Sequence, residues 1–193
     1  MKILKEIGSW LLYIAAAFII ASLLNVFVFQ ITRVQGSSMV PTLHHGDLYV
    51  ISKIGNLTNA CPDYEDVIVI DSRSQRVRSL SDDFTDILKY NVITSLLKPS
   101  TDDIYWVKRV IGLPGDTIKM EDGKLYRNGI LLEETYVNPD EDPVYSGSEI
   151  EVPEGYIWVM GDNRNHSTDS RVIGPVPIEN VIGKLKFRLK SGK

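Results

Sequence analysis

Three short blocks of this chain carry the residues that could do chemistry. They span residues 36–43, 108–116 and 161–171 and read Gly-Ser-Ser-Met-Val-Pro-Thr-Leu, Lys-Arg-Val-Ile-Gly-Leu-Pro-Gly-Asp and Gly-Asp-Asn-Arg-Asn-His-Ser-Thr-Asp-Ser-Arg. The first supplies hydroxyl groups, the second an amine and the third a rigid polar turn. A serine hydroxyl becomes a good nucleophile when a base removes its proton, and a neutral lysine amine can be that base. Together the blocks therefore suit hydrolysis by a serine with a lysine base.

Lys108 lies where a lysine could lose its proton. An unperturbed lysine has a pKa of about 10.4, so burial must lower this value before the amine can act near neutral pH. Residues 104–111 are predicted to form a β-strand, and most neighbours of Lys108 in it are bulky and apolar. A lysine on an exposed strand face is the simpler alternative. The strand pattern alone leaves both readings open.

The blocks resemble those of bacterial type I signal peptidases. That family has a nucleophile box Ser-Met-x-Pro-Thr-Leu, a base box Lys-Arg-x-x-Gly-x-Pro-Gly-Asp and a third box Gly-Asp-Asn-Arg-x-x-Ser-x-Asp-Ser-Arg, and residues 46–50 resemble its remaining box. All four occur in the family's order after one apolar N-terminal segment. The resemblance spans nearly the whole chain and is closest to the short, Gram-positive-like form.

The resemblance implies a role for each matched residue. The family's nucleophile falls on Ser38, its base on Lys108, and the serine that orients the lysine amine on Ser167. Three charged residues look like supports that hold the third block in place: Arg109, Asp169 and Arg171. Turn formation alone would explain the other polar residues of that block, Asp162, Asn163 and Asn165.

The resemblance also implies an oxyanion hole at the Gly36 region. The backbone N–H of Ser38 would donate to the negative charge that develops on the substrate oxygen. Some relatives add a side-chain hydroxyl two residues before the nucleophile, but Gly36 occupies that position here. A second, side-chain donor is therefore not assigned.

No metal or cofactor is expected. Adjacent His44 and His45 would point to opposite faces of an extended strand, and with His166 they form no zinc-binding pattern, so solvated loop histidines are the better interpretation. The third block lacks the glycine that a calcium loop has at its sharp turn and the bidentate glutamate at its end. Cys61 is the chain's single cysteine, which excludes an intrachain disulfide. A net charge of −4 gives no reason to expect nucleic acid as a partner.

The N-terminal segment is predicted to anchor the protein in a membrane. Residues 10–29 contain no charged side chain, and twenty helical residues rise about 30 Å, the thickness of a bilayer's hydrocarbon core. Lys2 and Lys5 favour a cytoplasmic N-terminus. We expect a cytoplasmic part at 1–8, a single transmembrane helix at 9–31 and an extracytoplasmic catalytic part at 32–193. A cleavable signal peptide with a site near residues 15–17 is the alternative.

The outer part is predicted to be mainly β. Short β-type runs at 48–51, 67–70, 104–111, 156–160 and 181–189 alternate with turn residues. Asp122-Gly123 and Asn128-Gly129 predict two tight turns around a strand at 124–127, within a small hairpin subdomain at about 117–150. Apolar residues at helical spacing predict an inserted amphipathic helix at about 80–99. The overall expectation is a signal-peptidase-like β catalytic core.

By resemblance, the protein is a membrane-bound serine endopeptidase that removes signal peptides from secreted preproteins. Small residues would precede the cut at the first and third positions. An extended peptide beside a strand presents alternate side chains to one face, so two shallow pockets could select them. The lipid membrane and the protein export machinery are the other expected partners. The alternatives are a non-catalytic or specialised pilus or secretion assembly factor on the same scaffold, and a self-cleaving Ser-Lys repressor, for which a DNA-binding segment is missing.

Overall fold

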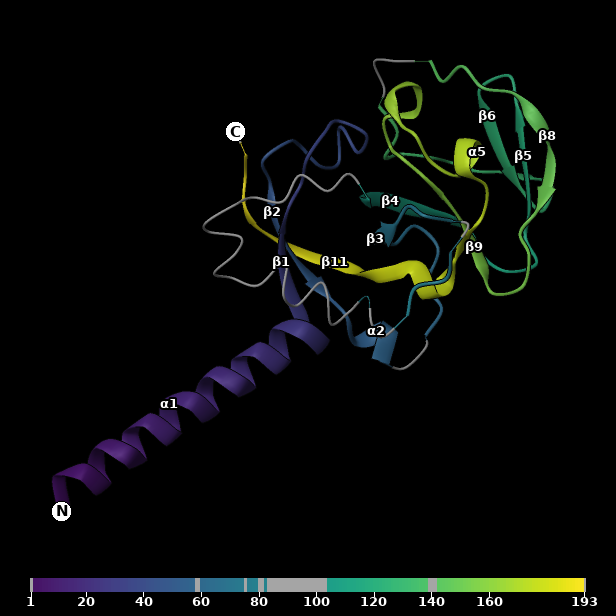
Figure 1. Ribbon diagram of the computed structural model, residues 1–193. Helices are drawn as coiled ribbons and strands as arrows, with labels where there is room; N and C mark the ends of the chain where they lie inside the picture. The colour runs from purple at the N-terminus through teal and green to yellow at the C-terminus, as the bar shows by residue number, and fades with distance from the viewer. Residues whose placement is uncertain are drawn as a thin grey trace.

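The structure is a computed structural model that describes residues 2–57, 60–74, 76–79, 82, 104–138 and 142–192. It consists of one long N-terminal helix and a body made of two antiparallel β-sheets (Figure 1). The expectation of a mainly β protein is confirmed. Apart from Asp82, the amphipathic helix expected at about 80–99 lies outside the described residues.

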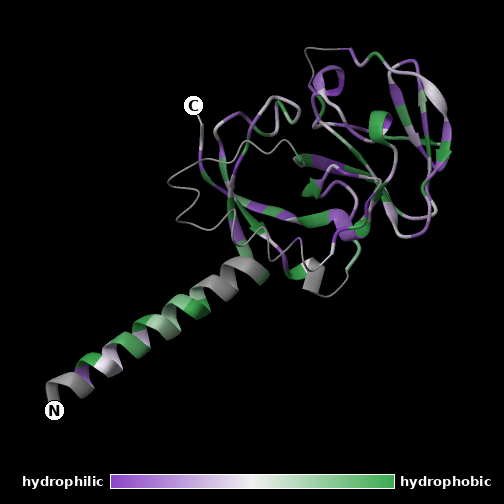
Figure 2. Cartoon of the chain, viewed as in Figure 1, coloured by the Kyte–Doolittle hydropathy of each residue, from purple (hydrophilic) through white to green (hydrophobic). Residues whose placement is uncertain are grey.

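Helix α1 (Lys2–Phe27) projects away from the body (Figure 1). Its described side chains are largely exposed, among them Trp10, Leu12 and Phe18. Figure 2 colours much of the described part of the helix as hydrophobic. Within the part of the chain that the structure describes, no helix combines the length and the apolar character needed to cross a membrane.

The helix bounds differ from the expected 9–31 at both ends. The helix starts at Lys2 and ends at Phe27, and the chain continues as strand β1 (Phe29–Arg33). This strand pairs antiparallel with β2 (Leu48–Ser52), with Phe29 opposite Ser52. The expected helix end at 31 is therefore wrong, because strand pairing satisfies the backbone N–H and C=O groups of residues 29–31, which four further helical residues would otherwise have to do.

The larger sheet has seven strands in the order β1-β2-β11-β3-β4-β9-β10. Its other members are β3 (Val67–Asp71), β4 (Tyr105–Gly112), β9 (Tyr156–Met160), β10 (Val176–Pro177) and β11 (Val181–Lys190). The five strands expected in this sheet are confirmed to within one residue at each end. The sequence pattern missed β1 and the two-residue β10.

Short helices connect these strands. Those with described bounds are α2 (Ile54–Leu57), α5 (Ser170–Ile173) and two 3-10 turns, η1 (Arg164–His166) and η2 (Ile178–Asn180). The turn η1 and the helix α5 both belong to the third sequence block, so the polar turn expected there is built from two helical turns around Ser167.

The smaller sheet has four strands in the order β7-β6-β5-β8. These are β5 (Thr117–Glu121), β6 (Lys124–Arg127), β7 (Ile130–Leu131) and β8 (Gly147–Glu151). Two predicted hairpin turns join the first three, and Asp122, Gly123, Asn128 and Gly129 all have positive φ, as type I′ turns require. The sheet lies where the sequence predicts a hairpin subdomain, whose standing as a separate unit stays a prediction.

The two sheets share a hydrophobic core. Ile111 and Trp158 from the larger sheet pack with Ile118 and Leu125 from the smaller one, and all four are almost fully buried. A separate cluster, which includes Val34, Met39 and Leu43, packs the chain between β1 and β2 against β4. This packing fixes the position of the first sequence block beside the second.

Candidate active site

Ser38, Lys108 and Ser167 meet at one point of the structure. Lys108 Nζ lies 3.0 Å from Ser38 Oγ and 3.2 Å from Ser167 Oγ, within hydrogen-bond distance of both hydroxyls. The three side chains come from the chain between β1 and β2, from strand β4, and from the turn after η1. The fold therefore brings together the hydroxyl, the amine and the polar turn that the three blocks supply.

The Lys108 amine is buried, and burial changes its acidity. The residue is 3% exposed, and the Trp106 ring lies 5.5 Å from Nζ. Loss of hydration disfavours the charged form and lowers the pKa of Lys108 to about 8; the negative charge of Asp169 opposes this shift, and the positive charge of Arg171 adds to it. A large fraction of this amine is therefore neutral near pH 8, where it can accept a proton.

Asp169 holds the turn that carries Ser167. One of its carboxylate oxygens accepts a hydrogen bond from Gly161 N at 3.0 Å, and both accept from the Arg171 guanidinium at 2.8 Å. Burial alone would raise the pKa of Asp169, but hydrogen bonds and the Arg171 charge outweigh it and keep this pKa below its usual range. Arg171 also donates to the Ser167 carbonyl oxygen. The two ends of the turn are thus fixed on either side of Ser167.

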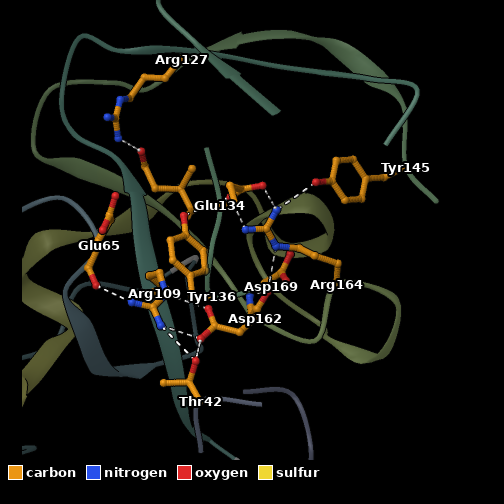
Figure 3. A network of polar contacts seen from close by, with 12 residues as sticks. Thr42, Glu65, Arg109, Arg127, Glu134, Tyr136, Tyr145, Asp162, Arg164 and Asp169 are labelled. Atoms are coloured by element: carbon orange, nitrogen blue, oxygen red, sulfur yellow. Dashed lines mark hydrogen bonds and ion pairs between the residues drawn. The ribbon is translucent and has the colours of Figure 1, made fainter. Parts of the chain in front are cut away.

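Arg109 joins all three sequence blocks. Its guanidinium donates to both oxygens of Asp162, at 2.8 and 2.6 Å, and to the hydroxyl of Thr42 at 3.2 Å (Figure 3). Thr42 in turn donates to Asp162. Arg109 also donates to the Glu65 carbonyl oxygen. This buried cluster ties the nucleophile segment, strand β4 and the third block to one another.

The segment around Ser38 is held by the third block. Asn163 N donates to the Ser38 carbonyl oxygen at 3.0 Å, and the Asn163 side chain donates to the Ser37 carbonyl oxygen at 3.2 Å. Gly36 has a φ of +86°, a conformation that favours glycine, and its N–H donates to His45 Nδ1. Because Asn163 holds the carbonyl oxygens of Ser37 and Ser38, the backbone of these two residues is fixed relative to the third block.

Metal ligands do not gather near this site. In the described residues, no group of three or more His, Cys, Asp or Glu side chains is placed to hold a metal ion. His45 accepts a hydrogen bond from a backbone N–H instead, and Cys61 is an exposed free thiol.

Residues 7–190 match the sequence profile of the family described as "Signal peptidase, peptidase S26". The chain belongs to this family. The resemblance to signal peptidases drawn from the sequence blocks is thereby confirmed. The contact between Ser38 and Lys108 therefore lies in a member of a peptidase family.

Several proteins named as signal peptidases are similar to this chain over most of its length. A probable signal peptidase I-1 of Synechocystis sp. is 35% identical over 89% of this chain and 76% of its own. The signal peptidase I of Bacillus caldolyticus is 32% identical over 95% of this chain and 91% of its own. A solved signal peptidase I from Enterococcus faecalis V583 is 28% identical, covering 65% of this chain and 97% of its own with a TM-score of 0.45.

Of the candidate residues, Ser38, Lys108 and Ser167 lie within hydrogen-bond distance of one another, and Arg109, Asp169 and Arg171 bond to the third block. Sequence reasoning missed the structural roles of Thr42, Gly161 and Asp162, although all three lie within the quoted blocks. It also missed Glu134, which pairs with Arg164. Thr42 and Asp162 are 120 residues apart, so no local pattern could have indicated that they share a hydrogen bond.

Proposed function

We propose that this protein is a signal peptidase in which Ser38 attacks the scissile carbonyl and Lys108 acts as its base. The contact between Lys108 Nζ and Ser38 Oγ at 3.0 Å carries this proposal. Membership of family S26 supports a serine endopeptidase that cleaves signal peptides. A neutral amine takes the hydroxyl proton as the new bond between Oγ and the carbonyl carbon forms, which gives a tetrahedral intermediate.

Lys108 then acts a second time in the same cycle. As an ammonium group it returns the proton to the leaving amine, which leaves the substrate as an ester on Ser38. A water molecule, deprotonated by the neutral amine, then attacks this ester, and the ammonium group passes that proton to Ser38 Oγ as the ester bond breaks and the product is released. Ser167 supports both steps, because its hydroxyl lies 3.2 Å from Nζ and fixes the direction in which the amine points.

The oxyanion hole is proposed to use backbone donors. The N–H of Ser38 is the main candidate, supported by the carbonyl hydrogen bonds from Asn163 that fix this part of the chain. Fixed donors stabilise the developing negative charge without any reorganisation during the reaction. Gly36, which has no side chain, offers no additional hydroxyl.

We also propose that α1 holds the enzyme in a membrane as a single-pass anchor, with the N-terminus in the cytoplasm and the catalytic part outside. Support comes from the uncharged sequence of residues 10–29 and from the projection of α1 away from the body (Figure 1). Anchoring would bring the site close to signal peptides, which are themselves apolar, and to the export machinery. Protease protection of a tagged N-terminus in sealed vesicles tests this topology.

The decisive experiment measures cleavage of a pool of preproteins by the purified full chain, with the new N-termini mapped by mass spectrometry. Wild type should release mature proteins after small residues at the first and third positions before the cut. Ser38→Ala and Lys108→Ala should each abolish cleavage, and the double variant should be no worse, because residues that act as a unit are not additive. Full activity in either folded single variant would contradict the proposal.

A further inference from the structure

Glu134 forms a buried ion pair with Arg164, away from the proposed dyad. The Glu134 carboxylate accepts two hydrogen bonds from the Arg164 guanidinium, at 2.7 and 2.5 Å (Figure 3). The Arg164 side chain is 1% exposed and that of Glu134 12% exposed. A pair this deeply buried is costly to break, because removing one partner leaves the other charge without compensation.

Arg164 connects this pair to the site. It begins turn η1, three residues before Ser167, and its Nε donates to the Gly161 carbonyl oxygen at 3.0 Å. The N–H of Gly161 donates in turn to Asp169. A continuous path of hydrogen bonds therefore runs from Glu134 through Arg164 and Gly161 to both ends of the turn that carries Ser167.

The segment between β7 and β8 makes further contacts with the same turn. Tyr145 OH accepts from Arg164 Nη1 at 2.9 Å, and the Asn165 side chain both donates to the Asp142 carbonyl oxygen and accepts from Val144 N. The segment also reaches Arg109, whose guanidinium lies 4.0 Å from the centre of the Tyr136 ring. The segment between β7 and β8 thus contacts the active-site turn at Arg164 and at Asn165.

We infer that Glu134 is a positioning residue of the active site: by holding Arg164, it fixes the turn from Gly161 to Asp169 and keeps Ser167 against the Lys108 amine. The inference rests on the proposed function, since it concerns how well the amine is directed at Ser38. The neighbouring Glu133 carries the same charge in the same segment but is exposed, so replacing it tests for an effect of charge alone, without the ion pair to Arg164 that Glu134 forms.

Loss of this support has a signature that simple destabilisation lacks. If the turn loosens, Ser167 moves away from the amine and water reaches Lys108, so the acidic limb of kcat/KM shifts to higher pH. A role in stability alone would reduce the amount of folded enzyme and leave the midpoint of that limb unchanged. The direction follows because hydration favours the charged form of the amine.

The test compares Glu134→Gln, Glu134→Asp and the control Glu133→Gln in the full chain with a signal-peptide substrate, well below the melting temperature of each variant. Glu134→Gln should lower kcat about 10–100-fold with little change in KM and move the limb up by about half a pH unit or more. Glu134→Asp keeps the charge and should restore part of kcat. Glu133→Gln should match wild type in kcat, KM and pH profile.

Several outcomes would overturn the inference. One is a Glu134→Gln enzyme whose activity per folded molecule and pH midpoint equal those of wild type; another is a Glu133→Gln enzyme with the same shift. If Glu134→Gln does not fold, the double variant Glu134→Gln/Arg164→Gln removes both charges, and the same shift is expected from it. Failure of the proposed function is distinct, because wild type itself would then be inactive or Ser38→Ala would retain activity.

Discussion

Gly161 and Ser167 pack so closely that a Cβ atom on Gly161 would lie 2.6 Å from the Cβ of Ser167. The same added atom would lie 2.5 Å from the Ser38 carbonyl oxygen. Both distances are far below van der Waals contact. The absence of a side chain at Gly161 is therefore a geometric requirement for Ser38 and Ser167 to approach the same lysine.

Gly161→Ala should inactivate the enzyme with a smaller effect on folding. The added methyl group must push Ser167 or the Ser38 segment away, and a displacement of about 1 Å can lower the rate roughly 100-fold. Overpacking of this kind costs about 1–3 kcal/mol of unfolding free energy. Gly55→Ala is the matched control, since nothing lies within 4 Å of its added Cβ. If the folded Gly161→Ala enzyme had a kcat near that of wild type, Gly161 would not need to lack a side chain for catalysis.

Asp162→Asn should destabilise the fold more than loss of a surface carboxylate does. The variant leaves the buried Arg109 guanidinium without its charged partner, a change that typically costs about 3–5 kcal/mol. Glu121→Gln breaks the exposed pair with Lys119 and should leave the unfolding free energy nearly unchanged. Denaturant unfolding of both variants measures the difference, and equal midpoints would show that the Arg109–Asp162 pair has no special role in stability.

The sequence predicted those parts of the fold that depend on local pattern. The hairpin turns at Asp122-Gly123 and Asn128-Gly129 follow from residues that adopt positive φ, and the central strands follow from runs of β-branched and aromatic residues. Strand β1 was missed because Phe29 and Ile31 continue the apolar run of the helix, and only pairing with β2 distinguishes a strand from a longer helix.

The candidate site was predicted through whole blocks, and the contacts between blocks could not be. Matching blocks indicated Ser38, Lys108 and Ser167, and the apolar strand around Lys108 was compatible with its burial. The Glu134–Arg164 pair joins residues 30 positions apart, and Glu133 and Glu134 look equivalent in the sequence. Only the fold decides which of these two carboxylates is buried.

Ser167→Ala should slow the enzyme without abolishing the reaction. The proposed role of this hydroxyl is to orient the Lys108 amine, from which it lies 3.2 Å away. Loss of one orienting hydrogen bond of about 1.5–4 kcal/mol lowers kcat roughly 10–1000-fold. Single-turnover kinetics with a signal-peptide substrate measures this change. A wild-type rate with an unchanged pH profile would mean that Ser167 does not orient the amine.

Activity should rise with pH because the neutral form of Lys108 is the reactive one. With a pKa of about 8 in the folded protein, kcat/KM should fall about tenfold for each pH unit well below this value. A histidine base would give an acidic limb of similar shape. Replacing His44, His45 and His166 together with Gln should leave the limb in place, and its disappearance in the triple variant would show that Lys108 is not the base.

Lys108→Met should abolish activity and make the folded protein more stable at neutral pH. The pKa of Lys108 falls from 10.5 in the unfolded chain to about 8 in the folded protein, so folding disfavours the charged amine. Between these two values the unfolded state binds more protons, and wild-type stability therefore increases as pH rises through this window. Below it the full penalty remains, about 3 kcal/mol at about 1.4 kcal/mol per pH unit.

Methionine has a similar length and no charge, so the gain in unfolding free energy from Lys108→Met should be largest near pH 7 and shrink toward pH values of about 10. Urea unfolding at several pH values measures this, with the exposed Lys124→Met as control; a gain that does not depend on pH would contradict the proposed cost of burying the Lys108 charge.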